Sequence, residues 1–179
     1  MPDLDRVRRI VTGHNADGKS VFVEDRICPH VVKRANGNTI VELWYTDEHP
    51  VDNSGYEDPG IPNKVLDTGK DGSLFHIVIY PPDAERIAAT EAAKARGEQI
   101  SARYEGKGRH FGFHATETLD YAIVLKGEIY ALMDEGELKM TDGDVLIQRG
   151  TSHAWSNRGN QPCSVLFAMI PAKPLKDQA

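Results

Sequence analysis

Two histidines and an aspartate, His114, Asp120 and His153, are the residues of this chain whose types and spacing best fit metal chemistry. Side chains of an extended strand point alternately to its two sides, so positions 114, 116, 118 and 120 share one face. Positions 153, 155 and 157 share a face in the same way. Two imidazoles and one carboxylate can bind Fe(II), Mn(II), Ni(II) or Zn(II), with water in the open positions. The pattern predicts a small β-barrel whose polar interior can hold a divalent metal.

Two metal-free interpretations of these residues stay open. In the first, the histidines and Asp120 form a hydrogen-bonded polar cluster that lines a ligand pocket. In the second, the cluster has a purely structural role. Because an unpaired buried carboxylate destabilises a fold, Asp120 needs a metal or an imidazolium as its partner, which argues against the structural interpretation.

Five further residues are candidates for proton transfer or substrate binding. His76 lies on a predicted strand; if its face points into the barrel, it can act as a general base or a fourth ligand, and otherwise it is an ordinary histidine. Tyr80 shares that face and Trp155 lies near the second histidine, so both can line a pocket or simply pack in the core. Arg149 can bind a carboxylate or phosphate in a bidentate manner, or it is solvated in its turn. Thr116 is a candidate substrate contact on the face of the first histidine.

The order of these residues resembles the two motifs of the cupin family, G-x5-H-x-H-x3-4-E-x6-G and G-x5-P-x-G-x2-H-x3-N. The first motif maps, with its spacing intact, onto Gly108, His114, Thr116, Asp120 and Gly127. The second maps onto Gly143, Gly150, His153 and Asn157. Three departures stand out: Thr116 replaces the second histidine, Asp120 replaces the glutamate, and Gln148-Arg149 replaces the proline in a turn one residue shorter.

The resemblance implies a double-stranded β-helix, a jelly-roll barrel in which the two motif strands are neighbours and His114, Asp120 and His153 converge. It also implies a homodimer, with N-terminal strands that pack on the partner subunit. Threonine is not a strong ligand and aspartate is one methylene shorter than glutamate, so a weaker metal site is expected than in a three-histidine cupin. Cupins carry many chemistries on one barrel, so the resemblance names no reaction.

The elements that position these residues are mostly short strands. Strands are predicted at 19–25, 31–33, 39–45, 74–80, 121–125, 128–133, 138–140, 145–148, 153–157 and 164–170. Their regular spacing is typical of an all-β sandwich or barrel. One surface helix is predicted near 83–97, where alanine, glutamate and lysine dominate. Residues 47–63, dense in Pro, Gly, Asn and Asp, are predicted to form a long loop that closes over the pocket or takes part in a dimer contact.

Length and composition limit the class of protein. A chain of 179 residues suits a single domain, with 1–70 as N-terminal strands and loop and 71–171 as the barrel core. A net charge of −6 with scattered basic residues argues against a nucleic-acid partner. Cys28 and Cys163 fit no metal or redox spacing and are expected as free buried thiols. The N-terminus lacks an apolar signal core and no run resembles a membrane span, so a cytoplasmic protein without membrane contact is expected.

These features favour a metal-dependent enzyme that acts on a small organic substrate. Lyase, dehydratase or isomerase chemistry fits, as does oxygenase chemistry, and the absent second histidine favours the non-redox group. His76 and Asp120 are the residues expected to take part in catalysis. The alternative is a metal-free cupin that binds a small molecule without turnover.

Overall fold

The computed structural model describes residues 5–55, 57–59, 68, 70–98 and 109–174. These residues form strands and one helix in the following order: β1 Arg8–His14, β2 Ser20–Ile27, β3 Val31–Lys33, β4 Thr39–Thr46, β5 Ser73–Tyr80, α1 Asp83–Ala95, β6 Thr118–Lys126, β7 Glu128–Met133, β8 Glu137–Thr141, β9 Val145–Arg149, β10 His153–Ser156 and β11 Cys163–Pro171. The predicted all-β fold with a single helix is therefore confirmed. The first glycine of the first motif, Gly108, lies outside the described residues.

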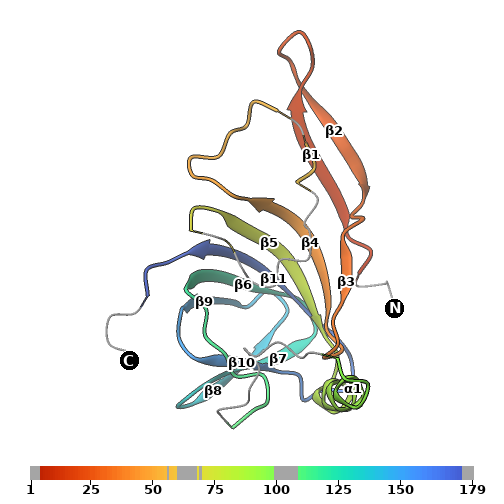
Figure 1. Ribbon diagram of the computed structural model, residues 1–179, viewed down its shortest axis with the longest axis vertical. Helices are drawn as coiled ribbons and strands as arrows, with labels where there is room; N and C mark the ends of the chain where they lie inside the picture. Colours follow the sequence, from red (N-terminus) through yellow and green to blue (C-terminus); the bar gives the residue numbers. More distant parts are fainter. Residues whose placement is uncertain (1–4, 56, 60–67, 69, 99–108, 175–179) are drawn as a thin grey trace.

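Two antiparallel sheets curve around the main core (Figure 1). The larger sheet has the order β3-β4-β5-β11-β6-β9, and the smaller has the order β10-β7-β8. Strands β1 and β2 form a separate hairpin that extends away from the barrel. This arrangement is a double-stranded β-helix, as the sequence predicts. Strands β3 and β4 belong to the large sheet, so part of the predicted 1–70 segment is joined to the barrel wall.

The strand register places the candidate residues in the barrel. Phe167 of β11 pairs with His76 on one side and with Ala122 on the other. Two residues further along β11, Met169 pairs with Asp120. Because alternate side chains of a strand point to the same side, His76 and Asp120 both face inward with this row of core residues. The sequence left open which way this face of β5 points; the structure turns it inward, since its alternate apolar residues lie in the main core and His76 is 2% exposed.

The helix α1 is fixed to the barrel by a buried arginine. Arg86 Nη1 donates hydrogen bonds to the Trp155 carbonyl oxygen and to Asp83 Oδ1, both at 2.8 Å. The guanidinium lies over the rings of Tyr80 and Phe111, at 5.2 and 4.9 Å from their centroids. A helix that is polar on most of its surface thus docks through buried Arg86 and Ala93 and through hydrogen bonds to Asp83, whereas the sequence predicts a solvated surface helix. The helix also ends at Ala95, two residues before the predicted end.

The long predicted loop is tied to the N-terminal hairpin at Asp58. Its carboxylate is paired with Arg9 of β1 and with Arg26 of β2, and it also contacts His30 at 3.1 Å. Arg9 is 6% exposed and donates a hydrogen bond to the Leu43 carbonyl oxygen of β4. This part of the loop therefore holds the hairpin against β4, whereas position 56 and positions 60–63 lie outside the described residues.

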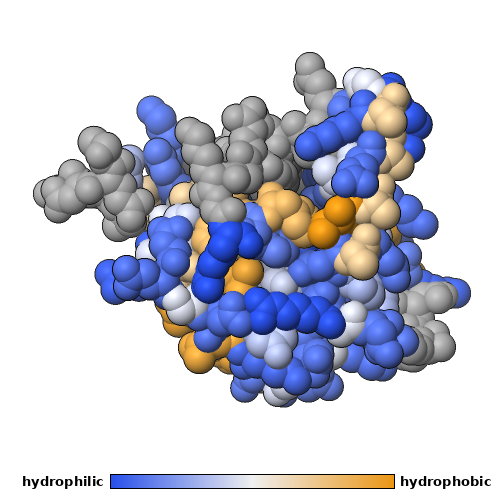
Figure 2. Space-filling view, turned by 90° about the horizontal axis from the view of Figure 1, so that it is seen from below, coloured by the Kyte–Doolittle hydropathy of each residue, from blue (hydrophilic) through white to orange (hydrophobic). Residues whose placement is uncertain are grey.

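Figure 2 shows the end of the molecule nearest α1 and β8, where hydrophilic side chains cover most of the surface. Hydrophobic residues appear there in small groups. No helix in the described part of the chain has the length and apolar character needed to cross a membrane.

Candidate metal and substrate site

The two histidines of the motifs lie side by side. The backbones of His114 and His153 exchange two hydrogen bonds, each with an N···O distance of 2.9 Å. Their ring centroids are 4.5 Å apart. His114 precedes β6, and this backbone bridge joins it to the first residue of β10. The structure therefore brings together two side chains that are 39 residues apart in the sequence.

Both imidazoles are oriented by backbone carbonyl groups. His114 Nδ1 lies 2.8 Å from the Gly112 carbonyl oxygen, and His153 Nδ1 lies 2.9 Å from the Thr151 carbonyl oxygen. A carbonyl oxygen only accepts, so each Nδ1 carries the hydrogen and the neutral ring has its lone pair on Nε2. Metal-binding histidines are commonly oriented in this way, with one ring nitrogen donating to a carbonyl group.

His153 is held in the neutral form that metal binding requires. It is 3% exposed. Burial, together with the charge of His114, lowers the pKa of His153 to about 4, and the hydrogen bond to the Thr151 carbonyl only partly offsets this. At neutral pH its Nε2 lone pair is available to a metal ion or to a hydrogen-bond donor.

Asp120 supplies a buried carboxylate on the wall formed by β6. It is 4% exposed, and its Oδ1 atom has no hydrogen-bond partner. Burial raises the pKa of Asp120 to about 6, against the opposite effect of a hydrogen bond with Thr118. Its register partner on β9 is Gln148. A carboxyl group in this state can bind a cation or exchange a proton near neutral pH.

The three predicted ligands come from two different sheets. No group of three or more His, Cys, Asp or Glu side chains within the described residues is arranged to hold a metal ion. Asp120 lies on the large sheet. His153 lies on the small sheet, and the backbone bridge between His114 and His153 joins His114 to that sheet as well. Even so, two oriented imidazoles and a buried carboxylate oxygen without a partner are donors of the kind that divalent metals use, so the residues fit such an ion chemically.

His76 lies on the inner face of β5 beside an unexpected acid, Glu42. The His76 ring meets Phe167 edge-on, with the centroids 5.7 Å apart. Burial, and then the positive charge of Arg34, lowers the pKa of His76 to about 4. Glu42 is the register partner of His76 on β4, is 1% exposed, and has no hydrogen-bond partner at Oε2. Burial raises the pKa of Glu42, with the nearby Arg34 acting in the opposite direction.

Sequence reasoning missed Glu42. Its signal was present, because an acidic residue interrupts the otherwise apolar strand TIVELWY. A buried carboxylate at such a position has to be paired, protonated or functional, and Glu42 Oε1 lies 3.8 Å from Arg34 Nη2.

Tyr80 and Trp155 are packed in the main core. Trp155 meets the Phe167 ring at a centroid distance of 5.4 Å and the Tyr80 ring at 6.4 Å. It also lies edge-on to His153, at 6.1 Å. Both aromatic residues are buried, at 7% and 4% exposure, so they form the wall between the histidine pair and His76.

Thr116 and Arg149 line a surface hollow of about 400 Å³ at the start of β6. The Thr116 hydroxyl is hydrogen-bonded to that of Thr118, with 2.7 Å between the Oγ1 atoms. Lys173 lines the same hollow. The structure thus separates Thr116 and Arg149, on this hollow, from Tyr80 and Trp155 in the core.

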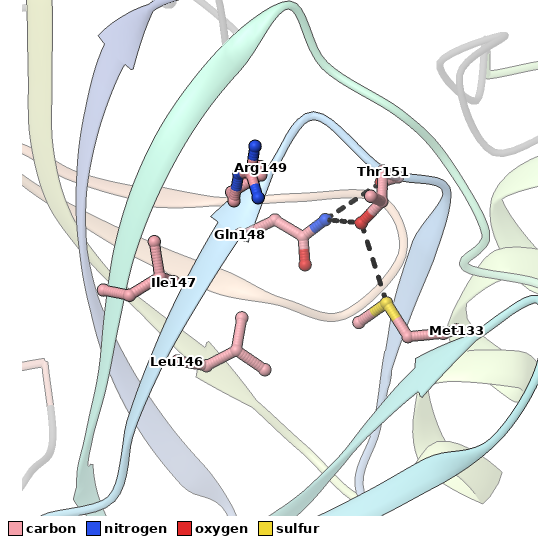
Figure 3. Close-up of a pocket in the computed structure, with 6 residues that line it drawn as sticks. All are labelled: Met133, Leu146, Ile147, Gln148, Arg149 and Thr151. Atoms are coloured by element: carbon pink, nitrogen blue, oxygen red, sulfur yellow. Dashed lines mark hydrogen bonds between the residues drawn. The ribbon is translucent and has the colours of Figure 1, made fainter. Parts of the chain in front are cut away.

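A second hollow of about 350 Å³ lies beside β9 (Figure 3). It is lined by Met133, Leu146, Ile147, Gln148, Arg149 and Thr151. Gln148 is 2% exposed, and its Nε2 donates to the carbonyl oxygen of Thr151 at 3.0 Å and also to the hydroxyl of that residue. Gln148 was noted in the sequence only as a replacement for proline, because its facing depends on the register of β9 with β6.

Comparisons with known proteins give a family match, related sequences and a similar solved structure. The family described as Cupin domain matches residues 102–169. The Phomopsin biosynthesis cluster protein C' of Diaporthe leptostromiformis is 30% identical, over 98% of this chain and 84% of the relative. The Cupin-domain-containing oxidoreductase virC of Hypocrea virens is 28% identical, over 97% of this chain and 80% of the relative. Among solved structures, the Cnp3 cupin domain of Schizosaccharomyces pombe has a TM-score of 0.45 and 11% identity, over 92% of this chain and 87% of that chain.

Proposed function

Because this chain belongs to the cupin family, we propose that it is a metal-dependent enzyme that acts on a small organic molecule inside its barrel. The observation that carries the proposal is the pair formed by His114 and His153. Each ring is oriented through Nδ1 by a backbone carbonyl group and presents its Nε2 lone pair. Metal-binding histidines commonly donate their other ring N–H to a carbonyl group in this way, and here two adjacent rings do so.

In this proposal His114 and His153 hold the ion, and Asp120 is the third ligand. Its partnerless Oδ1 and its burial support that role. When bound, Fe(II), Mn(II), Ni(II) or Zn(II) supplies polarisation of a substrate oxygen and, in the case of iron, redox chemistry with dioxygen. The smaller donor set favours a weaker affinity than that of a three-histidine cupin.

The chain's own residues supply proton transfer and substrate contacts. His76 is neutral at pH 7 and can accept a proton at its ring, and Asp120 can accept one at Oδ1. Trp155 and Tyr80, buried in the core, form the apolar support behind the substrate site. Thr116 and Arg149 contact the polar end of the substrate from the rim, where both line the hollow at β6.

Two reaction classes follow. Relatives such as virC are named oxidoreductases, which supports oxygen-dependent oxidation. The threonine in place of the second histidine supports lyase, dehydratase or isomerase chemistry instead. Oxygen consumption by the iron-loaded protein across a panel of small hydroxy and keto acids separates the two classes.

Metal analysis of the purified protein tests the proposal. We expect about one divalent ion per chain after loading with Fe(II), Mn(II), Ni(II) or Zn(II), because the site has one set of donors. The variants His114→Ala and His153→Ala should lose the ion. His14→Ala is the matched control, since His14 lies exposed on the β1–β2 hairpin, and it should retain the ion. A native protein that binds none of the four ions stoichiometrically would refute the metal-dependent function.

The alternative is a metal-free cupin that binds a small molecule without turnover. It is favoured by one observation, namely that no three-ligand group is assembled among the described residues. Binding of a small molecule by protein that has been treated with a chelator, together with no uptake of added metal, is the result that supports this function.

We also propose a homodimer and a cytoplasmic location. The outer face of the large sheet exposes the apolar side chains of Phe75, Tyr121, Val145 and Ile170. A second copy of the chain would remove such a face from water, and light scattering on the wild-type protein and on Tyr121→Lys tests this by the loss of the dimer mass. Both cysteines are free and buried, as is usual in a reducing compartment.

A further inference from the structure

We propose that the hollow beside β9 binds the substrate, and that Gln148 and Arg149 select a small organic anion that carries a hydroxyl group and a branched apolar chain. The inference rests on the proposed function, because it names the substrate class of the same site. The hollow has a volume of about 350 Å³ and is shown in Figure 3. That volume is near the lower end for small-molecule pockets, so the ligand must be small.

Gln148 presents a hydrogen-bond acceptor to the hollow. Within the described residues, Gln148 makes two side-chain hydrogen bonds, and in both of them Nε2 donates to Thr151. A side-chain amide has two N–H hydrogens and one carbonyl oxygen, so Oε1 is what remains to meet a ligand. Figure 3 shows Oε1 turned away from Thr151. A ligand group that donates, such as a hydroxyl, fits this atom, whereas a carboxylate oxygen placed there would be repelled.

Arg149 presents a positive charge at the rim. It is exposed, and it lines both this hollow and the one at the start of β6. Within the part of the chain that the structure describes, no carboxylate forms an ion pair with it. A guanidinium binds a carboxylate in a planar, bidentate manner, so the ligand is expected to be an anion, with its charge toward the rim.

The remaining lining is apolar. Met133, Leu146 and Ile147 contribute aliphatic surface. Since this surface excludes highly charged ligands and favours branched hydrocarbon, the three elements of the hollow together describe a small hydroxy acid with an aliphatic chain.

The hollow is connected to the proposed metal ligands through a shared carbonyl group. The Thr151 carbonyl oxygen accepts a hydrogen bond from Gln148 Nε2 at 3.0 Å and one from His153 Nδ1 at 2.9 Å. Met133, which lines the hollow, is the register partner of His153, and Gln148 is the register partner of Asp120. A ligand in the hollow therefore lies against residues that flank two of the proposed ligands.

The test compares three probes on the full chain by calorimetry. The first probe is 2-hydroxy-4-methylpentanoate. The second is 4-methylpentanoate, which lacks the hydroxyl, and the third is the uncharged amide of 2-hydroxy-4-methylpentanoate. For the wild-type protein we expect the loss of the hydroxyl to weaken binding about five- to tenfold, as for one net hydrogen bond. In Gln148→Met, which keeps the side-chain length but lacks the acceptor, the two acids should bind equally.

Arg149→Gln should weaken the two acids, leave the amide unchanged and preserve the preference for the hydroxyl. Arg96→Gln is the control, because Arg96 is an exposed arginine at the end of α1, and it should behave as the wild-type protein does. If Gln148→Met does not fold, Gln148→Leu replaces it, with circular dichroism as the check. Discrimination that persists in the folded variant, or no binding of either acid, would overturn the inference.

Measuring metal content on the same samples keeps the two proposals separate. Hydroxyl discrimination in a protein that binds no metal supports the hollow and refutes the metal-dependent function. Stoichiometric metal without hydroxyl discrimination supports the function and refutes the role of Gln148.

Discussion

Replacing His76 by phenylalanine should remove much of the acid sensitivity of the fold. His76 is 2% exposed and packs against Phe167, and burial is the main reason that its pKa falls from 6.5 to about 4. Between these two values the unfolded chain binds a proton at His76 that the folded chain does not bind. The free energy of unfolding therefore falls as the pH is lowered from about 6.5 to about 4, and the contribution of His76 is fully present only above that interval.

The size of this effect follows from the two pKa values. At about 1.4 kcal/mol per pH unit, the interval from 6.5 to about 4 corresponds to about 3 kcal/mol. The phenylalanine of His76→Phe does not titrate and has a similar shape. Between pH 7 and pH 4, the free energy of unfolding of this variant should therefore fall by about 3 kcal/mol less than that of the wild-type protein.

Urea unfolding at pH 7 and pH 4, followed by tryptophan fluorescence, measures this difference. His14→Phe serves as the control, because His14 lies exposed on β1, and it should lose as much stability as the wild-type protein. If His76→Phe also loses as much, the histidine is not held neutral by burial, and the inward placement of this face of β5 is wrong.

Three further outcomes are expected. Arg86→Met should lower the free energy of unfolding by about 3–5 kcal/mol in urea titrations, because it removes one partner of a buried ion pair and leaves the acid behind. In thermal melting, Gly127→Ala should lower the melting temperature more than Gly136→Ala does. Both glycines have a positive φ. However, a β-carbon at position 127 meets backbone atoms at 3.1 Å, whereas a β-carbon at position 136 has nothing within 4 Å. Cys28 and Cys163 should not react with a thiol reagent at pH 8 until urea is added, since both are buried and burial raises the pKa of Cys163 to about 12; the release of fewer than two thiols in urea would contradict this.

The sequence was sufficient wherever a local pattern decides the structure. Alternation along β5 predicted that Leu74, His76, Val78 and Tyr80 share one face, because strand geometry fixes the period at two, and the structure turns that face inward. The glycine and histidine spacing of the two motifs likewise indicated the barrel and the meeting of His114 with His153.

The rest depends on contacts that no local pattern encodes. The burial of Arg86 arises from the docking of α1 on Trp155, which is 69 residues away, so an alanine-rich helix gave no sign of it. The position of Asp120 relative to the histidine pair depends on which sheet each strand joins, and strand spacing within one motif cannot fix the distance between sheets. In the same way, the facing of Gln148 depends on the register of β9 against β6.

The position of β11 has a consequence for how this chain is made. It follows every other strand in the sequence, yet it is inserted between β5 and β6 in the middle of the large sheet. During synthesis on the ribosome, the edges of β5 and β6 that pair with β11 therefore have no partner strand until residues 163–171 emerge. Pairing across such sequence distances is slow, so the large sheet stays incomplete, and open to chaperones and to aggregation, until β11 is added.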